Sequence, residues 1–286
     1  MRSWTKFFFT GLLLWILTVL VTVWTANTNL IPTLILLGSF LTPVTFVVWA
    51  YGRGRSEQVT VELLFKAFVI GGVLGVLGAS ALESWLLKPS ALIYVGVGLI
   101  EEGVKLLALM FVARHLQRRS ARDGLVLGAT VGFGFAAFES AGYAFNALFA
   151  QGNALSVRQV VETEILRGVL APVGHGLWTA ILGGVLFSVS ARGFRITPKV
   201  FFAYLGVSLL HALWDSMSAI AIAITLVLTG RPWQFELLRI GAVPRVTEEQ
   251  IHVYTITDWL GLLVISVIGL VWLRTVAHRR TPDPFG

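Results

Sequence analysis

The sequence has no cysteine and few charged residues. Only 13% of its 286 residues are Asp, Glu, Lys or Arg, whereas soluble domains carry about 25%. Without cysteine there is no disulfide framework, no thiolate metal site and no cysteine nucleophile. Hydrophobic residues make up 56% of the chain, and the mean hydropathy is +0.80. This composition excludes a soluble domain and predicts a protein that crosses a membrane several times.

Several motifs of well-known enzymes are also missing. The sequence contains no GxSxG, no HExxH and no GxxxxGK[ST], and Ser140 has no evident base in its own predicted helix. A nucleophilic serine and phosphate chemistry are therefore disfavoured. The net charge of +7 does not indicate nucleic-acid binding, because the basic residues lie mostly at the ends of apolar segments, where membrane topology requires them.

Apolar stretches predict an all-α integral membrane protein with about eight spanning helices in a polytopic bundle. A spanning helix needs about 20 apolar residues. The stretches that meet this length are residues 7–25, 30–51, 61–83, 91–113, 124–148, 166–189, 200–228 and 256–274. The first is longer than a signal peptide's apolar region, so we expect it to be retained as a span. The sequence shows no convincing repeat and no second domain. Residues 1–286 are therefore predicted to form a single membrane-embedded domain.

The basic residues predict the orientation of these spans. With eight spans and a cytoplasmic N-terminus, fifteen of the 22 basic residues fall in cytoplasmic segments and six fall outside. This bias towards the inside favours both termini in the cytoplasm. We expect a multi-pass protein of the plasma membrane.

Ionisable residues lie deep within four of the predicted spans. One charged side chain at the middle of a bilayer costs roughly 3 kcal/mol on insertion scales, so such residues usually serve chemistry or ion movement. The deep residues are Glu101, Glu102 and Lys105 in span 91–113, Glu139 in span 124–148, His175 in span 166–189, and His211 and Asp215 in span 200–228. Other charges, such as Glu83 and Arg167, fall near span ends, where interface placement explains them.

The depths of these groups are similar. At 1.5 Å of rise per residue they lie roughly 8 to 15 Å below the outer surface of a core about 30 Å thick. Glu101 and Lys105 share a helix face, as do His211 and Asp215, because each pair is four residues apart. Each pair alone could simply be structural, but independent accidents would scatter in depth. We therefore predict one polar site in the outer half of the bilayer.

Carboxylates and histidines together suit the activation of a water molecule. One carboxylate takes the proton and returns it to a leaving amine, while imidazoles stabilise the oxyanion. We predict Glu101 or Glu102 as the base, with Lys105 neutralising the other glutamate and Asp215 orienting His211. His175, His211 and Glu139 are also a ligand set for Zn²⁺, with water as fourth ligand. The sequence leaves metal-assisted and metal-free attack as alternatives.

The order of these groups resembles the PrsW family of intramembrane proteases. Glu101-Glu102-x-x-Lys105 resembles the first motif of that family, Phe135-x-x-x-Glu139 the second, His175 the third and His211-x-x-x-Asp215 the fourth. The resemblance covers about residues 91–216, which we take as the catalytic core.

What the resemblance implies is cleavage of a membrane-anchored protein, for example an anti-sigma factor. A related group, which includes the enzyme trimming prenylated CAAX proteins, has the motifs EExxxR, FxxxH and HxxxN. Here the lysine comes one residue earlier and the later motifs end in glutamate and aspartate, which argues against a prenylated substrate.

Two other functions would also explain buried carboxylates and histidines. A proton- or cation-coupled transporter would use them for ion movement, although such proteins usually show inverted repeats with interrupted helices, and none is clear in the sequence. A non-catalytic membrane scaffold would use them for packing.

Overall fold

The computed structural model describes residues 3–52, 56–150 and 155–278, and their regular structure is helical. Seven helices in these ranges are long and apolar enough to cross a membrane. They span Ser3–Thr25, Thr28–Tyr51, Val61–Leu86, Ala121–Ala147, Val157–Ser188, Pro198–Thr229 and Glu248–Ala277. The protein is thus a multi-pass membrane protein, as its composition predicted.

The eighth predicted span forms helix α5 (Ile93–Val112), which differs from the other seven in its charge. With 20 residues it is long enough to cross the hydrocarbon core. It carries Glu101, Glu102 and Lys105 near its middle, and all three are buried within the bundle. These three charged residues make α5 less apolar than the seven spans. Neighbouring helices bury the charges and so keep them away from lipid.

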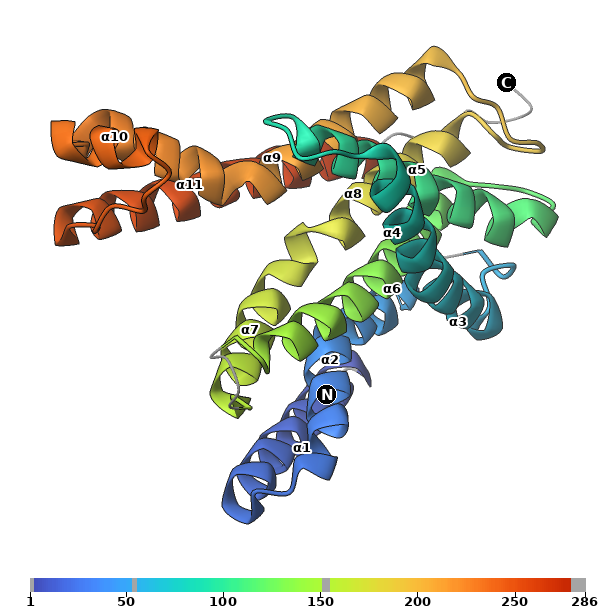
Figure 1. Cartoon of the computed structure of the whole chain (residues 1–286). Coiled ribbons are helices and arrows are strands. Elements are labelled where there is room, and N and C mark those ends of the chain that lie inside the picture. Colours follow the sequence, from blue (N-terminus) through green and yellow to red (C-terminus); the bar gives the residue numbers. More distant parts are fainter. Residues whose placement is uncertain (1–2, 53–55, 151–154, 279–286) are drawn as a thin grey trace.

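The first three spans form a hairpin and a single interrupted helix. Helices α1 (Ser3–Thr25) and α2 (Ile31–Tyr51) form a hairpin at the end of the molecule near the labelled N-terminus (Figure 1). The third span consists of α3 (Val61–Val69), a π-helical turn (Ile70–Leu74) and α4 (Gly75–Leu86). The turn packs on α6 (Ala121–Ala147).

The sixth predicted span is two helices rather than one. Helix α7 (Val157–Leu170) ends at a 3₁₀ turn (Ala171–Val173), and α8 (His175–Ser188) begins after Gly174. Pro172 lies in this turn and has no N–H to continue a helix. The segment therefore starts near residue 157, earlier than the predicted 166, and its break directly precedes His175.

The last two spans extend beyond the rest of the bundle. Helices α9 (Pro198–Thr229) and α11 (Glu248–Ala277) run side by side, with α10 (Pro232–Arg239) at their far end (Figure 1). Two buried amides close this end: Gln234 donates to Gln250 Oε1 at 3.0 Å, and Gln250 donates back at 2.8 Å. The segment between these two long helices is thus partly helical.

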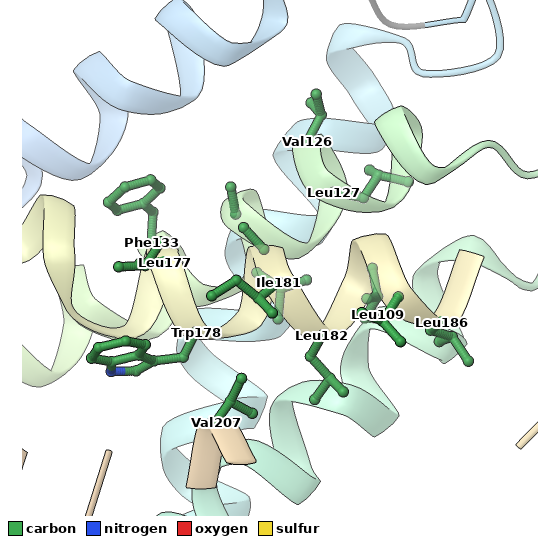
Figure 2. Close-up of a cluster of buried hydrophobic side chains, with 14 of the residues drawn as sticks. Leu109, Val126, Leu127, Phe133, Leu177, Trp178, Ile181, Leu182, Leu186 and Val207 are labelled. Atoms are coloured by element: carbon green, nitrogen blue, oxygen red, sulfur yellow. The ribbon is translucent and has the colours of Figure 1, made fainter. Parts of the chain in front are cut away.

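Helix α6 is the centre of the bundle, and its main partner is α8. Small residues allow the two backbones to approach closely. A Cβ atom on Gly124 would lie 2.2 Å from the carbonyl oxygen of Gly183, and one on Gly128 would lie 2.3 Å from that of Thr179. Apolar side chains of α5, α6, α8 and α9 pack around this contact, among them Leu109, Phe133, Trp178 and Val207 (Figure 2).

The close approach of α6 and α8 predicts the effect of adding one methyl group. Gly128→Ala should lower the free energy of unfolding by about 1–3 kcal/mol, because the carbonyl of Thr179 cannot move without shifting the helix. Gly142→Ala is the matched control on α6, where a Cβ would meet nothing within 4 Å. It should be neutral or stabilise by up to ~1 kcal/mol through helix propensity. Denaturant unfolding in detergent measures both; equal effects would contradict the packing.

Candidate active site

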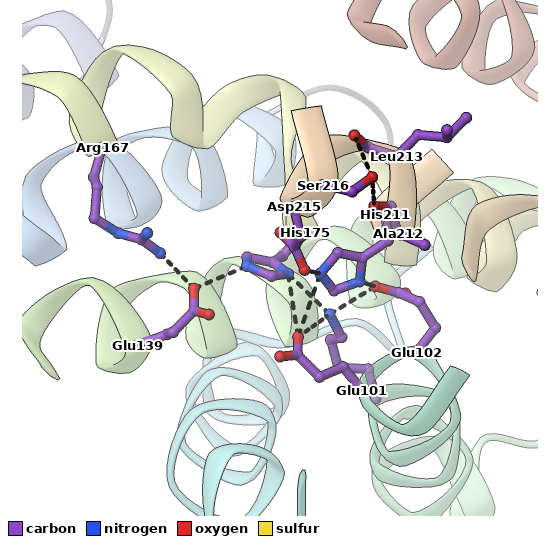
Figure 3. Close-up of polar contacts among 11 residues, drawn as sticks. Glu101, Glu102, Glu139, Arg167, His175, His211, Ala212, Leu213, Asp215 and Ser216 are labelled. Atoms are coloured by element: carbon purple, nitrogen blue, oxygen red, sulfur yellow. Dashed lines mark hydrogen bonds and ion pairs between the residues drawn. The ribbon is translucent and has the colours of Figure 1, made fainter. Parts of the chain in front are cut away.

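The deep polar residues of α5, α6, α8 and α9 meet in one cluster (Figure 3). Two glycines set the helix positions. A Cβ on Gly98 of α5 would lie 2.4 Å from the carbonyl oxygen of Ser208 on α9, so Glu101 and Glu102 come to lie beside His211. A Cβ on Gly132 of α6 would lie 2.3 Å from the carbonyl oxygen of His175.

Lys105 is at the centre of the cluster and is fully buried. Its Nζ lies 2.6 Å from Glu102 Oε1, 3.4 Å from Glu101 Oε2 and 2.9 Å from His175 Nδ1. An ammonium group has three N–H donors, which is the number of these contacts. The aromatic ring of Phe135, 4.4 Å from Nζ, faces the same cation. Lys105 therefore joins both glutamates of α5 to the histidine of α8.

His211 lies between carboxylates on both sides of its ring. Its Nδ1 is 3.1 Å from Glu102 Oε1, and its Nε2 is 3.2 Å from Asp215 Oδ2 and 3.6 Å from Glu101 Oε2. A carboxylate can only accept a hydrogen bond, so a ring nitrogen that bonds to one must carry the proton. Asp215, one helical turn further along α9, thus orients the ring of His211, as the spacing predicted.

His175 connects Lys105 to Glu139. Because Lys105 donates to Nδ1 of His175, the proton of the ring is on Nε2, which lies 2.9 Å from Glu139 Oε2. Arg167 of α7 forms an ion pair with the same carboxylate, and its Nε donates to Ser140 Oγ at 2.8 Å. The rings of His175 and His211 are 4.9 Å apart, centre to centre.

Sequence reasoning missed three residues of this region. Arg167 was placed at a span end because the predicted span began at residue 166. Thr179, whose hydroxyl donates to Glu102 Oε2 at 3.4 Å, follows His175 by one helical turn on α8. Glu83 was assigned to the interface, yet it borders a cavity shared with Glu101. Pro172 was the signal in the sequence that could have identified Arg167, because a proline indicates a helix break after residue 170 and thus a separate helix that contains Arg167.

Two cavities adjoin the cluster. The larger has a volume of about 370 Å³, and four carboxylates border it: Glu83, Glu101, Glu139 and Asp215. The smaller has a volume of about 130 Å³, and among the residues that line it are Arg167, His175, His211 and Trp214. Both are large enough to hold water.

Glu101 and Glu102 differ in their access to the larger cavity. The contacts of Glu101 with Lys105, His175 and His211 all involve Oε2, which leaves Oε1 without a polar partner among the described residues. Glu101 borders the cavity, whereas Glu102 is completely buried and bonds to Lys105, His211 and Thr179. Of these two glutamates, only Glu101 can meet a water molecule in the cavity without rearrangement.

Glu101, His175 and His211 form the one group in the described ranges with the spacing of a metal site. One ligand atom of each lies within 4.8 Å of the others. Glu101 Oε2 is 3.7 Å from His175 Nδ1 and 3.6 Å from His211 Nε2; tetrahedral Zn²⁺ with bonds near 2.0 Å separates its ligands by roughly 3.4 Å.

The donor set therefore fits Zn²⁺, with Glu101 in the position for which the sequence suggested Glu139. Glu139 instead bonds to His175 from the other side. Lys105 contacts two of the three donors, so its ammonium group would have to move away from them before an ion could bind. His211 Nε2, which donates to Asp215, would also have to lose its proton.

Comparison with known proteins gives the family. The model of the PrsW family of intramembrane metalloproteases matches residues 42–239, more than two thirds of the chain. The chain belongs to the PrsW family. It is thus an intramembrane protease, a peptide hydrolase, and the matched range includes all four predicted motifs.

Relatives of the same name support this. The chain is 27% identical over 176 residues to Protease PrsW of Shouchella clausii, covering 58% of this chain and 75% of the relative. It is 28% identical over 181 residues to Protease PrsW of Geobacillus kaustophilus, covering 60% and 74%. The same identity over 181 residues relates it to Protease PrsW of Clostridioides difficile, covering 58% and 71%. No solved structure matches the chain.

The burial of Lys105 predicts a large effect of removing its charge. Lys105→Met should destabilise the protein by about 3–5 kcal/mol, because two buried carboxylates lose their cation. Adding Glu102→Gln should recover part of this loss, because one of those charges is removed too. Lys66→Met is the control: its pair with Glu62 has the same spacing of four residues but is exposed, so less than ~1 kcal/mol should change. Thermal unfolding in detergent ranks the variants, and equal losses for both lysines would contradict the role of Lys105.

Proposed function

We propose that this PrsW family protein hydrolyses a peptide bond in a membrane-anchored protein, with Glu101 as the general base. The supporting observation is that Glu101 borders the larger cavity and that its Oε1 has no polar partner among the described residues, while Oε2 contacts Lys105 and two histidines. A carboxylate held in this way can accept a proton from water at one oxygen while its other oxygen stays fixed.

The reaction follows from this arrangement. Glu101 Oε1 takes a proton from a water molecule as the water oxygen attacks the carbonyl carbon of the substrate. The same carboxyl group then gives the proton to the amide nitrogen as the C–N bond breaks. Lys105 places a fixed positive charge near the developing oxyanion, and such a charge is most effective in a dry site.

The other residues of the cluster hold these groups in position. Asp215 and Glu102 fix the ring of His211, and Glu139 fixes that of His175. Arg167 neutralises Glu139 from α7. A Zn²⁺ ion bound by Glu101, His175 and His211 would supply a Lewis acid at the same place. The catalytic core in this proposal is residues 91–216, with Arg167 included.

The topology of the proposed enzyme has eight passes. Helix α5 crosses the membrane as the fourth, with its charged residues shielded from lipid by neighbouring helices, and both termini are cytoplasmic. The cluster then lies in the outer half of the bilayer of the cell membrane. A substrate with a segment anchored there, of which an anti-sigma factor is an example, could reach Glu101 from the outer face.

Interrupted membrane helices, like the one formed by α7 and α8, are also found in transporters. In transporters the interrupted helices form the binding site, and usually one lies in each of two related halves of the protein. Here no repeated half is clear in the sequence, and the other irregular span, with the π-helical turn Ile70–Leu74, stays helical throughout. A transporter is the alternative to this proposal, and solute uptake driven by a proton gradient would support it.

Substitution of the base tests the proposal in proteoliposomes with a membrane-anchored reporter. Glu101→Gln keeps the shape of the side chain but cannot take a proton, so cleavage should fall by about 10²–10⁴-fold. Glu162→Gln on α7, an exposed carboxylate paired with Arg158, is the control and should cleave like the wild type. Cleavage by Glu101→Gln at the wild-type rate would refute the assignment. Solute uptake under a pH gradient, with no cleavage by the wild type, would favour transport.

A further inference from the structure

We propose that the larger cavity binds a lysine or arginine side chain of the substrate, with Glu83 as its counter-charge. The proposal rests on the protease function above, because the ligand is a segment of the substrate. It concerns the choice of cleavage site rather than the chemistry.

Glu83 differs from the other carboxylates of the cavity in having no partner. Glu101 contacts Lys105, Glu139 is paired with Arg167 and His175, and Asp215 lies beside His211. Neither oxygen of Glu83 has a hydrogen bond or ion pair within the described part of the chain, and its Oε1 is buried. An unpaired carboxylate in a partly buried setting is costly, and a cation from outside would remove this cost.

The cavity itself supplies no such cation. None of the residues that line it is a lysine or arginine, although four are acidic. Lys105 and Arg167 reach Glu101 and Glu139 from behind the lining. A positive group entering the cavity would therefore meet a negative surface and no competing cation.

The spacing of the carboxylates favours a long organic cation over a metal ion. Glu83 belongs to no group of three acidic or histidine ligands within the distance that a metal requires, in the ranges that the structure describes. A lysine or arginine side chain needs only one carboxylate at its tip and apolar walls along its stem.

The walls of the cavity match such a stem. Val76 and Ala79 of α4, Val97 of α5 and Phe135 of α6 border it, which gives the methylene groups an apolar surface. Tyr94 and Tyr143 add aromatic rings, whose faces attract cations. At about 370 Å³ the cavity has room for one extended side chain and the attacking water.

The location of Glu83 connects this cavity with the scissile bond. Glu83 is on α4, three residues before the helix ends at Leu86, and Tyr94 is in the first turn of α5. Glu101 borders the same cavity from deeper in α5. A substrate segment that places its basic side chain against Glu83 thus brings its backbone towards the base.

Binding of synthetic single-span peptides tests this without relying on cleavage. The peptides carry about 20 leucine and alanine residues and one Lys, Gln or Glu at each of several successive positions near one end. Purified full-length protein in nanodiscs should bind the best lysine peptide about tenfold more tightly than its glutamine counterpart, a difference of about 1.4 kcal/mol. Glu83→Gln should abolish this preference, and Glu83→Lys should reverse it in favour of the glutamate peptide.

The control is Glu236→Lys, which makes the same change of charge at an exposed residue of α10. It should keep the preference for lysine. An unchanged preference in Glu83→Gln, or equal binding of lysine and glutamine peptides by the wild type, would overturn the proposal. Cleavage of the same peptides separates this result from the protease function: either overturning outcome, with cleavage by the wild type retained, contradicts only the role of Glu83, whereas absence of cleavage by the wild type contradicts the protease proposal.

Discussion

The whole site depends on one buried cation. The ammonium group of Lys105 has no exposure to solvent and contacts Glu101, Glu102 and His175. In a medium of low dielectric constant each of these carboxylates would be costly without it. Because the lysine is three and four residues after the two glutamates, a single turn of α5 holds all three charges. The histidines of α8 and α9 then complete the arrangement from the side.

Packing around α6 and α5 makes this arrangement possible. The glycines of α6 let α8 approach until backbone atoms are almost in contact, and Gly98 does the same between α5 and α9. Each approach brings a functional residue within reach: Glu139 meets His175, and Glu102 meets His211. The small-residue stripe on α6 thus has a direct consequence for the polar site, although its glycines contribute no polar side chain.

The sequence predicted the members of the cluster better than their contacts. Costly residues at similar depth in separate spans identified Glu101, Glu102, Glu139, His175, His211, Asp215 and Lys105, and the structure brings these side chains together. Depth alone could not distinguish Glu101 from Glu102, because the two differ in packing: Glu101 borders the larger cavity and Glu102 is completely buried. It also could not place Glu83 or Arg167, which lie near helix ends and become part of the site only through packing.

The spans show the same limit of sequence reasoning. Hydropathy found seven of them in the structure, because the period and length of an apolar stretch are local properties. The break before His175 was missed because Pro172 and Gly174 lie within a continuous apolar run. Helix α5 differs because its three charged residues lower its hydropathy, although contacts with other helices bury those residues.

The absence of native cysteine permits a direct measurement of the central claim, that side chains from separate helices share one site. Cysteines at Glu102 and His211, whose polar atoms are 3.1 Å apart, should be joined by a short bifunctional thiol reagent in membranes. A pair at Leu107 and His211 should not be joined, because Leu107 is 66% exposed on the outer face of α5. Efficient linkage of the first pair and none of the second is the predicted result. Failure of the first pair in folded protein with reactive thiols, or equal linkage of both, would contradict the account.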